Sequence, residues 1–138
     1  MAHVVDLNSD VGEGFGAWPG GPDRELMLLI TSADIACGFH AGDPSIIRRT
    51  CEMAAEKGVA IGAHVSYPDL AGFGRRFIDM KPAELADAVA CQLGALDGCA
   101  PGITSICVHS DTPGAAELAA AVAAGLLRHG YELRPFTR

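Results

Sequence analysis

The feature that most constrains the fold of this chain is an alternation of short apolar runs with longer helical patterns. The runs have the length of strands, and the stretches between them place apolar residues at helical spacing. We expect strands at 2–8, 33–39, 59–64 and 103–109, and helices at 23–31, 44–57, 82–96 and 113–130. Apolar strands that alternate with helices are typical of a parallel sheet covered by helices, so the sequence predicts an α/β fold built from parallel (β/α) units.

Two of the predicted helices carry clear start signals. Asp43-Pro44 and Thr112-Pro113 each put a capping side chain before a proline, which suits the N-cap and the first helical residue. Gly58 is the expected stop of the helix at 44–57. The segment 65–81 is too long for a bare connection, and long loops in compact domains are usually functional.

Composition narrows the class of protein. With 138 residues, 49% hydrophobic and 20% charged, the chain is long enough for one globular domain over residues 1–138. The net charge of −7 argues against a nucleic-acid partner, because binding phosphates needs a basic surface. The first residues have neither a basic start nor a long apolar stretch, so we expect no signal peptide and no membrane partner.

The cysteines point to a reducing compartment. The chain has 5 of them and no C-x-x-C spacing, which argues against a disulfide scaffold and against a zinc ribbon. We expect buried free thiols, because free cysteine packs as a small hydrophobic residue. This usage fits a cytoplasmic protein. The five positions are Cys37, Cys51, Cys91, Cys99 and Cys107.

A histidine or a cluster of acids follows every predicted strand. The side chains are, strand by strand, Asp6, Asn8, Asp10 and Glu13, then His40 and Asp43, then His64 and Asp69, then His109 and Asp111. The carboxyl ends of parallel strands lie at one edge, so we expect one shared site there. Histidine with carboxylate suits general acid–base catalysis, metal binding, or both. His3 and His129 fall outside the pattern.

Glycines and arginines add weaker signals. Gly38 and Gly42 flank His40 and would let the backbone adopt positive φ or approach a ligand closely. The glycine-rich stretch 10–21 lacks the Walker spacing, so it is a weak candidate for a phosphate site and equally an ordinary loop. Arg75 could lie over an anionic group of a substrate, or could be a solvated surface arginine.

Several motifs resemble one known family. They are DLNSDVGEGFG (6–16), SADIACGFHAGDP (32–44), GVAIGAHVSYPDLAGFGRR (58–76) and QLGAL (92–96). These motifs resemble the LamB/YcsF family over residues 4–97, and residues 106–133 resemble the family's C-terminal segment, with Ser110 in place of a glycine. The resemblance implies a partial version of a seven-stranded (β/α) barrel of the glycoside hydrolase/deacetylase type. Residues 1–97 would be the N-terminal and 103–138 the C-terminal family segment.

The resemblance also implies a loss. The middle of the family's chain, including a Lys-Pro-His-Gly strand end and a later Asp-Arg turn, is absent near residues 97–102. The chain therefore looks like a shortened homologue or the product of an internal deletion. A partial barrel has two open sheet edges, and open edges invite pairing. We expect a homodimer or a partner subunit to cover them.

The function that the resemblance implies is that of a component of the A-subunit type in ATP-dependent 5-oxoprolinase. Such a component hydrolyses 5-oxo-L-proline to L-glutamate with two other 5-oxoprolinase subunits, and ATP enters through the complex because phosphorylation makes the lactam attackable by water. The residues expected to carry proton transfer are His40 and His64, with Asp10 and Glu13 orienting them or holding a divalent metal. The candidates for substrate binding are Asp6, Asn8, Asp43, Arg75 and His109.

Two other functions stay open. The histidines and acids at the strand ends, with the barrel type, also suit a metal-dependent hydrolase or deacetylase-like enzyme. Stoichiometric zinc or manganese would favour it. A shortened barrel could instead be a non-catalytic binding or assembly module. Binding of 5-oxoproline without turnover would favour that alternative.

Overall fold

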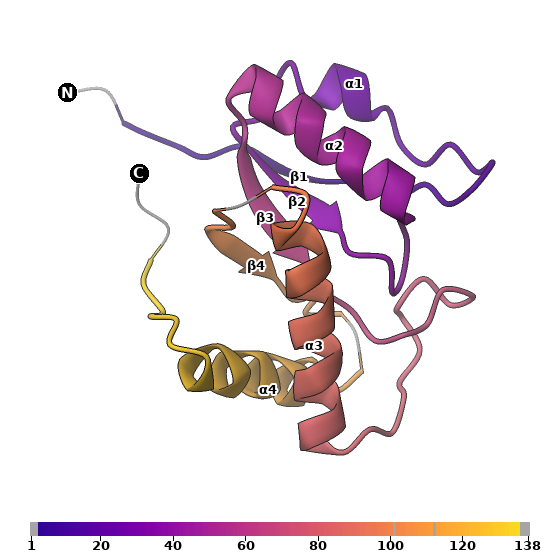
Figure 1. The fold of residues 1–138 in the computed structure, drawn as a ribbon, viewed down its shortest axis with the longest axis vertical. Helices are drawn as coiled ribbons and strands as arrows, with labels where there is room; N and C mark the ends of the chain where they lie inside the picture. Colours follow the sequence, from indigo (N-terminus) through magenta and orange to yellow (C-terminus); the bar gives the residue numbers. More distant parts are fainter. Residues whose placement is uncertain (1–2, 101, 112, 136–138) are drawn as a thin grey trace.

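Parallel strands and helices alternate along the chain, as Figure 1 shows for the computed structural model, which describes residues 3–100, 102–111 and 113–135. The elements are β1 (Asn8–Val11), α1 (Asp23–Leu26), β2 (Ser32–Ala36), α2 (Pro44–Lys57), β3 (Ala60–His64), α3 (Pro82–Asp97), β4 (Ser105–Cys107) and α4 (Ala115–Arg128). The four strands form one sheet in the order β1-β2-β3-β4, and every neighbouring pair is parallel. The predicted α/β class with parallel units is confirmed.

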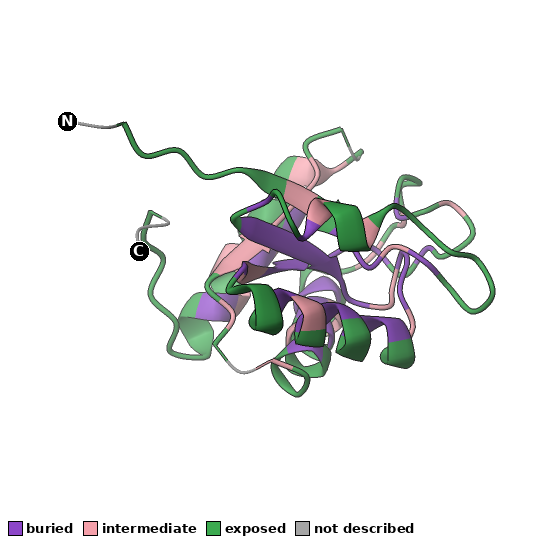
Figure 2. Ribbon diagram, turned by 90° about the horizontal axis from the view of Figure 1, so that it is seen from above, coloured by how far each residue is buried: buried purple, intermediate pink, exposed green. Residues whose placement is uncertain are grey.

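The two faces of the sheet differ in chemistry. Side chains alternate along a strand, and register partners point the same way. One face carries the buried Val11, Ile35 and Ala63, which share a core with Ile47 and Cys51 of α2. Figures 1 and 2 show α2 lying along the sheet.

The opposite face is polar, which corrects the expectation of strands that are apolar throughout. Beside three small residues, Ala36, Ala60 and Gly62, it carries Asn8, Asp10, Ser32, Asp34, His64, Ser105 and Cys107. In a closed barrel this would be the face that points toward the axis. A polar inner face is therefore what the sheet offers to a ligand.

Helix α2 begins and ends where the sequence predicts. The side chain of Asp43 accepts hydrogen bonds from the backbone N–H groups of Ser45 and Ile46, which satisfies donors that the first helical turn leaves unpaired. Pro44 follows as the first helical residue. Gly58 ends the helix with φ of 67°, a left-handed conformation that glycine adopts without steric cost.

Helices α3 and α4 supply the second part of the core. Leu85, Val89 and Leu96 of α3 are buried, and Leu118 and Val122 of α4 belong to the same cluster. Leu93, at helical spacing from these residues of α3, is partly buried. Among the residues that the structure describes, no helix combines the length and the apolar character that a membrane crossing requires.

Five of the predicted elements have bounds that are wrong by two residues or more, among them the strand expected at 33–39, which runs from Ser32 to Ala36. The strand expected at 2–8 begins only at Asn8, and the exposed residues before it lack a strand partner because β1 is an edge strand. The helix expected over 23–31 ends at Leu26, since the chain must reach the sheet, where the N–H of Thr31 donates to the carbonyl of Leu7. The strand expected at 103–109 shortens to β4, and like β1 it has a single neighbour.

The helix expected over 113–130 also starts late. It begins at Ala115, after Gly114 at φ of 80°. The predicted cap Thr112 lies outside the described residues. Pro113 is in a turn, so the second Pro-based helix start is wrong by two residues.

The expectation of buried cysteines holds for part of the set only. All five cysteines, each within the described residues, are free thiols. Cys37 and Cys51 are buried and Cys107 is half-buried, whereas Cys91 and Cys99 are exposed. Cys91 lies on α3 and Cys99 just after it, and the buried face of α3 is formed by other residues.

Candidate functional site

Three histidines meet at the carboxyl ends of the strands. The ring centroids of His40 and His64 are 4.3 Å apart, those of His64 and His109 are 4.1 Å apart, and those of His40 and His109 are 6.5 Å apart. His64 is the last residue of β3, and the other two follow β2 and β4. The predicted convergence of these side chains is confirmed, while their chemical roles stay predictions.

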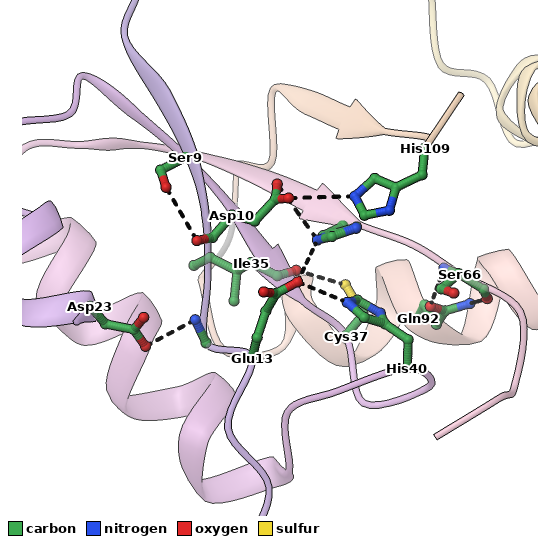
Figure 3. Close-up of polar contacts among 12 residues, drawn as sticks. Ser9, Asp10, Glu13, Asp23, Ile35, Cys37, His40, Ser66, Gln92 and His109 are labelled. Carbon is green, nitrogen blue, oxygen red and sulfur yellow. Dashed lines mark hydrogen bonds and ion pairs between the residues drawn. The ribbon is translucent and has the colours of Figure 1, made fainter. Parts of the chain in front are cut away.

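Two carboxylates from the β1 segment face the histidines (Figure 3). Glu13 Oε1 lies 3.3 Å from His40 Nε2 and 3.5 Å from His64 Nδ1. Asp10 lies 3.7 Å from His64 Nδ1 through Oδ1 and 3.4 Å from His109 Nε2 through Oδ2. The five side chains therefore form one connected cluster, which we call the histidine–carboxylate cluster.

Glu13 is positioned by a turn directly after β1. Gly12 has φ of 70°, and a Cβ at this position would lie 3.2 Å from the hydroxyl oxygen of Thr50. Its N–H donates to Asp23 Oδ2 at 3.0 Å, which ties the turn to α1. The N–H of Gly42 donates to the carbonyl of Gly14 at 2.7 Å. The loop that carries Glu13 is therefore joined to the loop that carries His40.

His40 is presented by a tight turn between two glycines. Gly38 and Gly42 have φ of 91° and 80°, and the N–H of Gly38 donates to the carbonyl of Ala41 at 2.9 Å. A Cβ at Gly42 would lie 3.1 Å from the carbonyl oxygen of Gly12, so only glycine fits between the two loops. The predicted role of both glycines in backbone geometry is confirmed.

The electrostatics of the cluster favour neutral imidazole. Burial, followed by the neighbouring His40 and His109, lowers the pKa of His64 to about 3. At neutral pH its ring is therefore uncharged. Both His40 and His64 are 1% exposed, and among the described residues the Nδ1 atom of each has no hydrogen-bond partner. Buried ring nitrogens without partners are available to a proton or to an ion.

The long segment 65–81 covers the cluster. The ring of Phe73 meets the ring of His40 edge-on at 5.2 Å, and Phe73 has a left-handed φ of 55°, which is strained for a residue with a side chain. A Cβ on the adjacent Gly74 would lie 1.9 Å from the hydroxyl oxygen of Ser66 and 2.9 Å from His40 Cβ. The loop thus packs on the site.

Arg75 and His109 lie at the site as predicted. Arg75 forms an ion pair with Asp111, and both side chains are exposed. Asp111 follows His109 by two residues, so this pair lies at the rim of the cluster. His109 is part of the cluster itself, with a side chain 19% exposed. Both remain candidates to contact a substrate.

The structure corrects the placement of Asp6 and Asn8 and confirms Asp43 as a helix cap, while the substrate-binding roles of all three stay predictions. Asp43 holds backbone N–H groups with both oxygens, because Oδ2 accepts from Gly16 at 2.9 Å while Oδ1 caps α2. Those hydrogen bonds, from Ile46 first, lower the pKa of Asp43. Asp6 and Asn8 lie before and at the start of β1, not at its end, because that strand begins later than predicted. All three therefore have structural contacts in place of a position within the cluster.

The contacts of Asp6 and Asn8 join β1 to β2. The hydroxyls of Thr31 and Ser32 donate to Asp6, each at 2.6 Å. Asn8 donates to the hydroxyl of Ser32 at 3.0 Å. These bonds hold the amino ends of the two strands together.

Sequence reasoning missed two residues beside the cluster. Asp34 lies on the polar face, where burial, with Asp10 and Asp6 nearby, raises its pKa. Its Oδ1 has no hydrogen-bond partner among the described residues. Cys107 lies on the same face, and its ligand atom and those of Asp10 and His109 all lie within 4.8 Å of one another. The sequence does signal Asp34, because it is an acid inside an apolar run. Nothing in the sequence marks Cys107 as a residue of the site.

Asp10, Cys107 and His109 are close enough together to hold a cation, and a second set of three side chains is as well. The donor atoms of Glu13, His40 and His64 lie within 4.8 Å of one another. These are two buried histidines and one partly buried carboxylate, whereas Asp10 in the Cys107 trio is exposed. The cluster can thus move protons, hold a divalent ion, or do both.

Comparison with known proteins places the whole cluster inside recognised segments. A sequence model of the LamB/YcsF family matches residues 5–103 and 99–138 of the chain. The first match contains Asp10, Glu13, His40 and His64, and the second contains His109. The two matches meet where the sequence predicts that the family's middle is missing.

Curated relatives share most of the N-terminal segment. The A subunit of 5-oxoprolinase from Nocardia farcinica is 66% identical over 94 residues, which are 68% of this chain and 38% of the relative. The protein of the same name from Bacillus licheniformis is 61% identical over 94 residues, 68% of this chain and 37% of the relative. The chain thus matches little more than a third of the length of these relatives, and its predicted shortening is confirmed.

A solved structure shares the fold. The lactam utilization protein from Thermus thermophilus matches with a TM-score of 0.82 and 40% sequence identity. The match covers 91% of this chain and 54% of that protein. The fold is therefore that of about half of a barrel-like relative, and the predicted partial version of a barrel is confirmed.

Proposed function

The chain belongs to the LamB/YcsF family, and from this membership we propose that it is a component of the A-subunit type in an ATP-dependent 5-oxoprolinase. In that role it hydrolyses the lactam of 5-oxo-L-proline to L-glutamate, together with two partner subunits. The observation that carries the proposal is the histidine–carboxylate cluster, all of whose members lie within the segments that match the family.

The reaction needs proton transfer at two atoms. Water attacks the lactam carbonyl carbon, the carbon–nitrogen bond breaks, and the ring nitrogen leaves as an amine after taking up a proton. A pKa near 3 makes His64 a weak base at neutral pH. His40 is the stronger candidate to take the proton from water, because Glu13 lies 3.3 Å from its Nε2 and can hold the ring in one tautomer.

The rim of the site suits the substrate's carboxylate. Arg75 lies at the rim, paired with the exposed Asp111. A substrate carboxylate could replace Asp111 as the partner of Arg75, because a guanidinium binds carboxylates through paired hydrogen bonds. His109, which faces Asp10, could then hydrogen-bond the substrate from the other side.

ATP would activate the lactam by transferring its terminal phosphoryl group to the lactam oxygen with release of ADP, and inorganic phosphate would leave after water has added to the same carbon. The residues of this chain suit a binding site for ATP elsewhere in the complex. Arg76 is held by Asp69 within the covering loop, and the proposal already uses Arg75 for the carboxylate of the substrate. The glycine-rich stretch 10–21 lacks the Walker spacing. We therefore assign ATP binding to the partner subunits.

Glutamate release tests the proposal. The chain is combined with its two partner subunits, 5-oxoproline and ATP, and glutamate is measured with and without ATP. We expect ATP-dependent release that His40→Ala reduces at least about 100-fold, the usual contribution of a general base. Cys91→Ala, a change at an exposed position on α3, serves as the control and keeps full activity.

The homologous Nocardia farcinica protein in the same assay shows whether the partner subunits are active. Full turnover by the His40→Ala complex would overturn the assignment of His40. No turnover by the wild-type chain beside an active Nocardia protein would overturn the enzymatic proposal.

A second candidate is a non-catalytic binding or assembly module. The observation that favours it is length, since the match covers 38% of the Nocardia farcinica relative and 54% of the solved barrel-like protein. Such a module would bind 5-oxoproline or the partner subunits without releasing glutamate. Calorimetric titration with 5-oxoproline, set beside the turnover assay, separates this function from catalysis.

A further inference from the structure

We propose that Glu13, His40 and His64 form a binding site for one divalent metal ion of the zinc type. The three donors come from three different segments of the sheet edge, which follow β1, follow β2 and end β3. Figure 3 shows the carboxylate of Glu13 directed at the ring of His40. The inference concerns metal binding alone, and with the ion bound Glu13 and His40 would be ligands, so the role of His40 as a general base belongs to the metal-free site.

The spacing of the donor atoms fits such an ion. Zinc–nitrogen and zinc–oxygen bonds of about 2.0–2.1 Å in a tetrahedron place any two donor atoms about 3.4 Å apart. Glu13 Oε1 lies 3.3 Å from His40 Nε2 and 3.5 Å from His64 Nδ1. Two edges of the tetrahedron are therefore already present in the folded chain.

The state of His64 gives an independent indication. The residue is 1% exposed, and among the described residues its Nδ1 has no hydrogen-bond partner although it faces Glu13 and Asp10. A buried ring nitrogen without a partner is unfavourable. A bound cation would satisfy this nitrogen and balance the charge of Glu13 at once.

The donor set selects the kind of ion. Two imidazoles and one carboxylate suit zinc and similar transition metals, whereas calcium and magnesium prefer oxygen donors alone. Three protein donors leave a fourth position for water, as in catalytic zinc sites. Asp10 lies beside the trio, 3.7 Å from His64 Nδ1, where it could accept a hydrogen bond from that water.

The neighbouring trio of Asp10, Cys107 and His109 is the rival position for an ion. The Asp10 side chain is 39% exposed, and the trio would use a thiolate as one donor. Only this rival position contains a sulfur donor, so the two positions can be distinguished by whether sulfur binds the ion.

The test is titration of the untagged, metal-free chain with zinc and with cobalt(II). We expect one equivalent of zinc by calorimetry and by elemental analysis after dialysis. Glu13→Gln, which keeps the size of the side chain, should weaken binding at least about tenfold, the smallest loss usual for altered metal sites. Cys107→Ser should bind as the wild type does, and the cobalt form should lack a sulfur-to-cobalt charge-transfer band.

Far-ultraviolet circular dichroism shows that each variant is folded. Zinc binding that is equal in Glu13→Gln and in the wild type would overturn the proposal. Loss of binding in Cys107→Ser, with a sulfur-to-cobalt band in the wild type, would place the ion at the rival trio and also overturn it. Because binding is read without substrate, failure here is distinct from failure of the oxoprolinase assay.

Discussion

At the scale of single residues, Gln92 shows how one buried side chain fixes the loop behind β3. Its Oε1 accepts the N–H of Ser66 at 2.9 Å, and its Nε2 donates to the carbonyls of Ser66 and Ala88 at 2.9 and 3.2 Å. The residue is fully buried on α3. Gln92 therefore pairs both backbone groups of Ser66, two residues after His64.

Replacement of Gln92 by leucine should destabilise the fold. The change leaves the N–H and the carbonyl of Ser66 buried without partners, at about 1–3 kcal/mol for each group. We expect the free energy of unfolding to fall by about 2–5 kcal/mol in urea denaturation. Cys91→Ala, at the adjacent exposed position, should change it by less than about 0.5 kcal/mol. A similar small change in Gln92→Leu would show that water satisfies Ser66.

Gly74 is the residue that lets the covering loop approach His40. It has φ of 70°, and any Cβ there would overlap Ser66 and press on His40. We expect Gly74→Ala to lower the free energy of unfolding by about 1–2 kcal/mol for the left-handed backbone alone. The clash should also shift the ring resonances of His40 in proton–nitrogen NMR spectra.

Gly94→Ala is the matched control for Gly74→Ala. Gly94 lies within α3, and a Cβ there would meet no described atom within 4 Å. This change should raise the free energy of unfolding by about 0.5–1 kcal/mol and leave the histidine resonances in place. Unchanged His40 resonances in Gly74→Ala would contradict the contact between loop and site.

Site residues could be predicted from the sequence where their position depends only on following the carboxyl end of a strand. His40, His64 and His109 follow apolar runs, so the parallel sheet alone brings them together. The position of Asp6 could not be predicted, because it depends on where β1 begins. The position of Asp34 could not be predicted either. Only the register of β2 with β1 and β3 shows which face of the sheet Asp34 occupies.

At the scale of elements, the covering loop is held by an ion pair within itself. Arg76 binds Asp69, and Asp69 also accepts the N–H groups of Gly72 and Arg76 at 3.0 and 3.2 Å. These hydrogen bonds, that of the Arg76 side chain first, lower the pKa of Asp69 from 3.8 to about 2. The loop is therefore tied to a carboxylate that stays ionised in the folded state.

The stability of the protein should consequently depend on Asp69 in acid. Because the folded pKa lies below the unfolded one, the contribution of Asp69 is complete above about pH 4 and is lost as the pH falls toward 2. We expect Asp69→Asn to flatten the decline of the urea midpoint between pH 5 and pH 2. Asp87→Asn, an exposed position on α3, should keep the wild-type decline. Parallel acid profiles for Asp69→Asn and the wild type would contradict the pairing.

Elements with local end signals could be predicted closely, and elements whose ends depend on pairing with distant residues could not. Helix α2 matches its predicted bounds because Asp43 and Gly58 set its ends by local hydrogen bonds and backbone geometry. Strands β1, β2 and β4 are shorter than predicted because the extent of a strand depends on the backbone that it pairs with, which local propensity does not show. Helix α1 is short because the chain must return to the sheet at Thr31.

At the scale of the whole molecule, the open sheet follows from the shortened chain. Strands β1 and β4 are the two edges, and neither is paired on its outer side within the described residues. The arm before β1 is extended and apolar, with Val4 97% and Val5 81% exposed. Figure 2 shows this arm standing away from the buried strands. An exposed apolar arm beside an open edge is a surface that another strand can pair with.

We therefore expect the isolated chain to associate through the β1 edge. Light scattering coupled to size exclusion should give at least twice the chain mass of 14.3 kDa at micromolar concentration. Val5→Lys should shift the mass toward that of one chain, because a charge on an edge disfavours strand pairing. Leu29→Lys places the same charge at an apolar position that is 70% exposed and outside the strands, and it should leave the mass unchanged. A single-chain mass for the wild type, or equal masses for both lysine variants, would show that another part of the molecule protects or covers this edge.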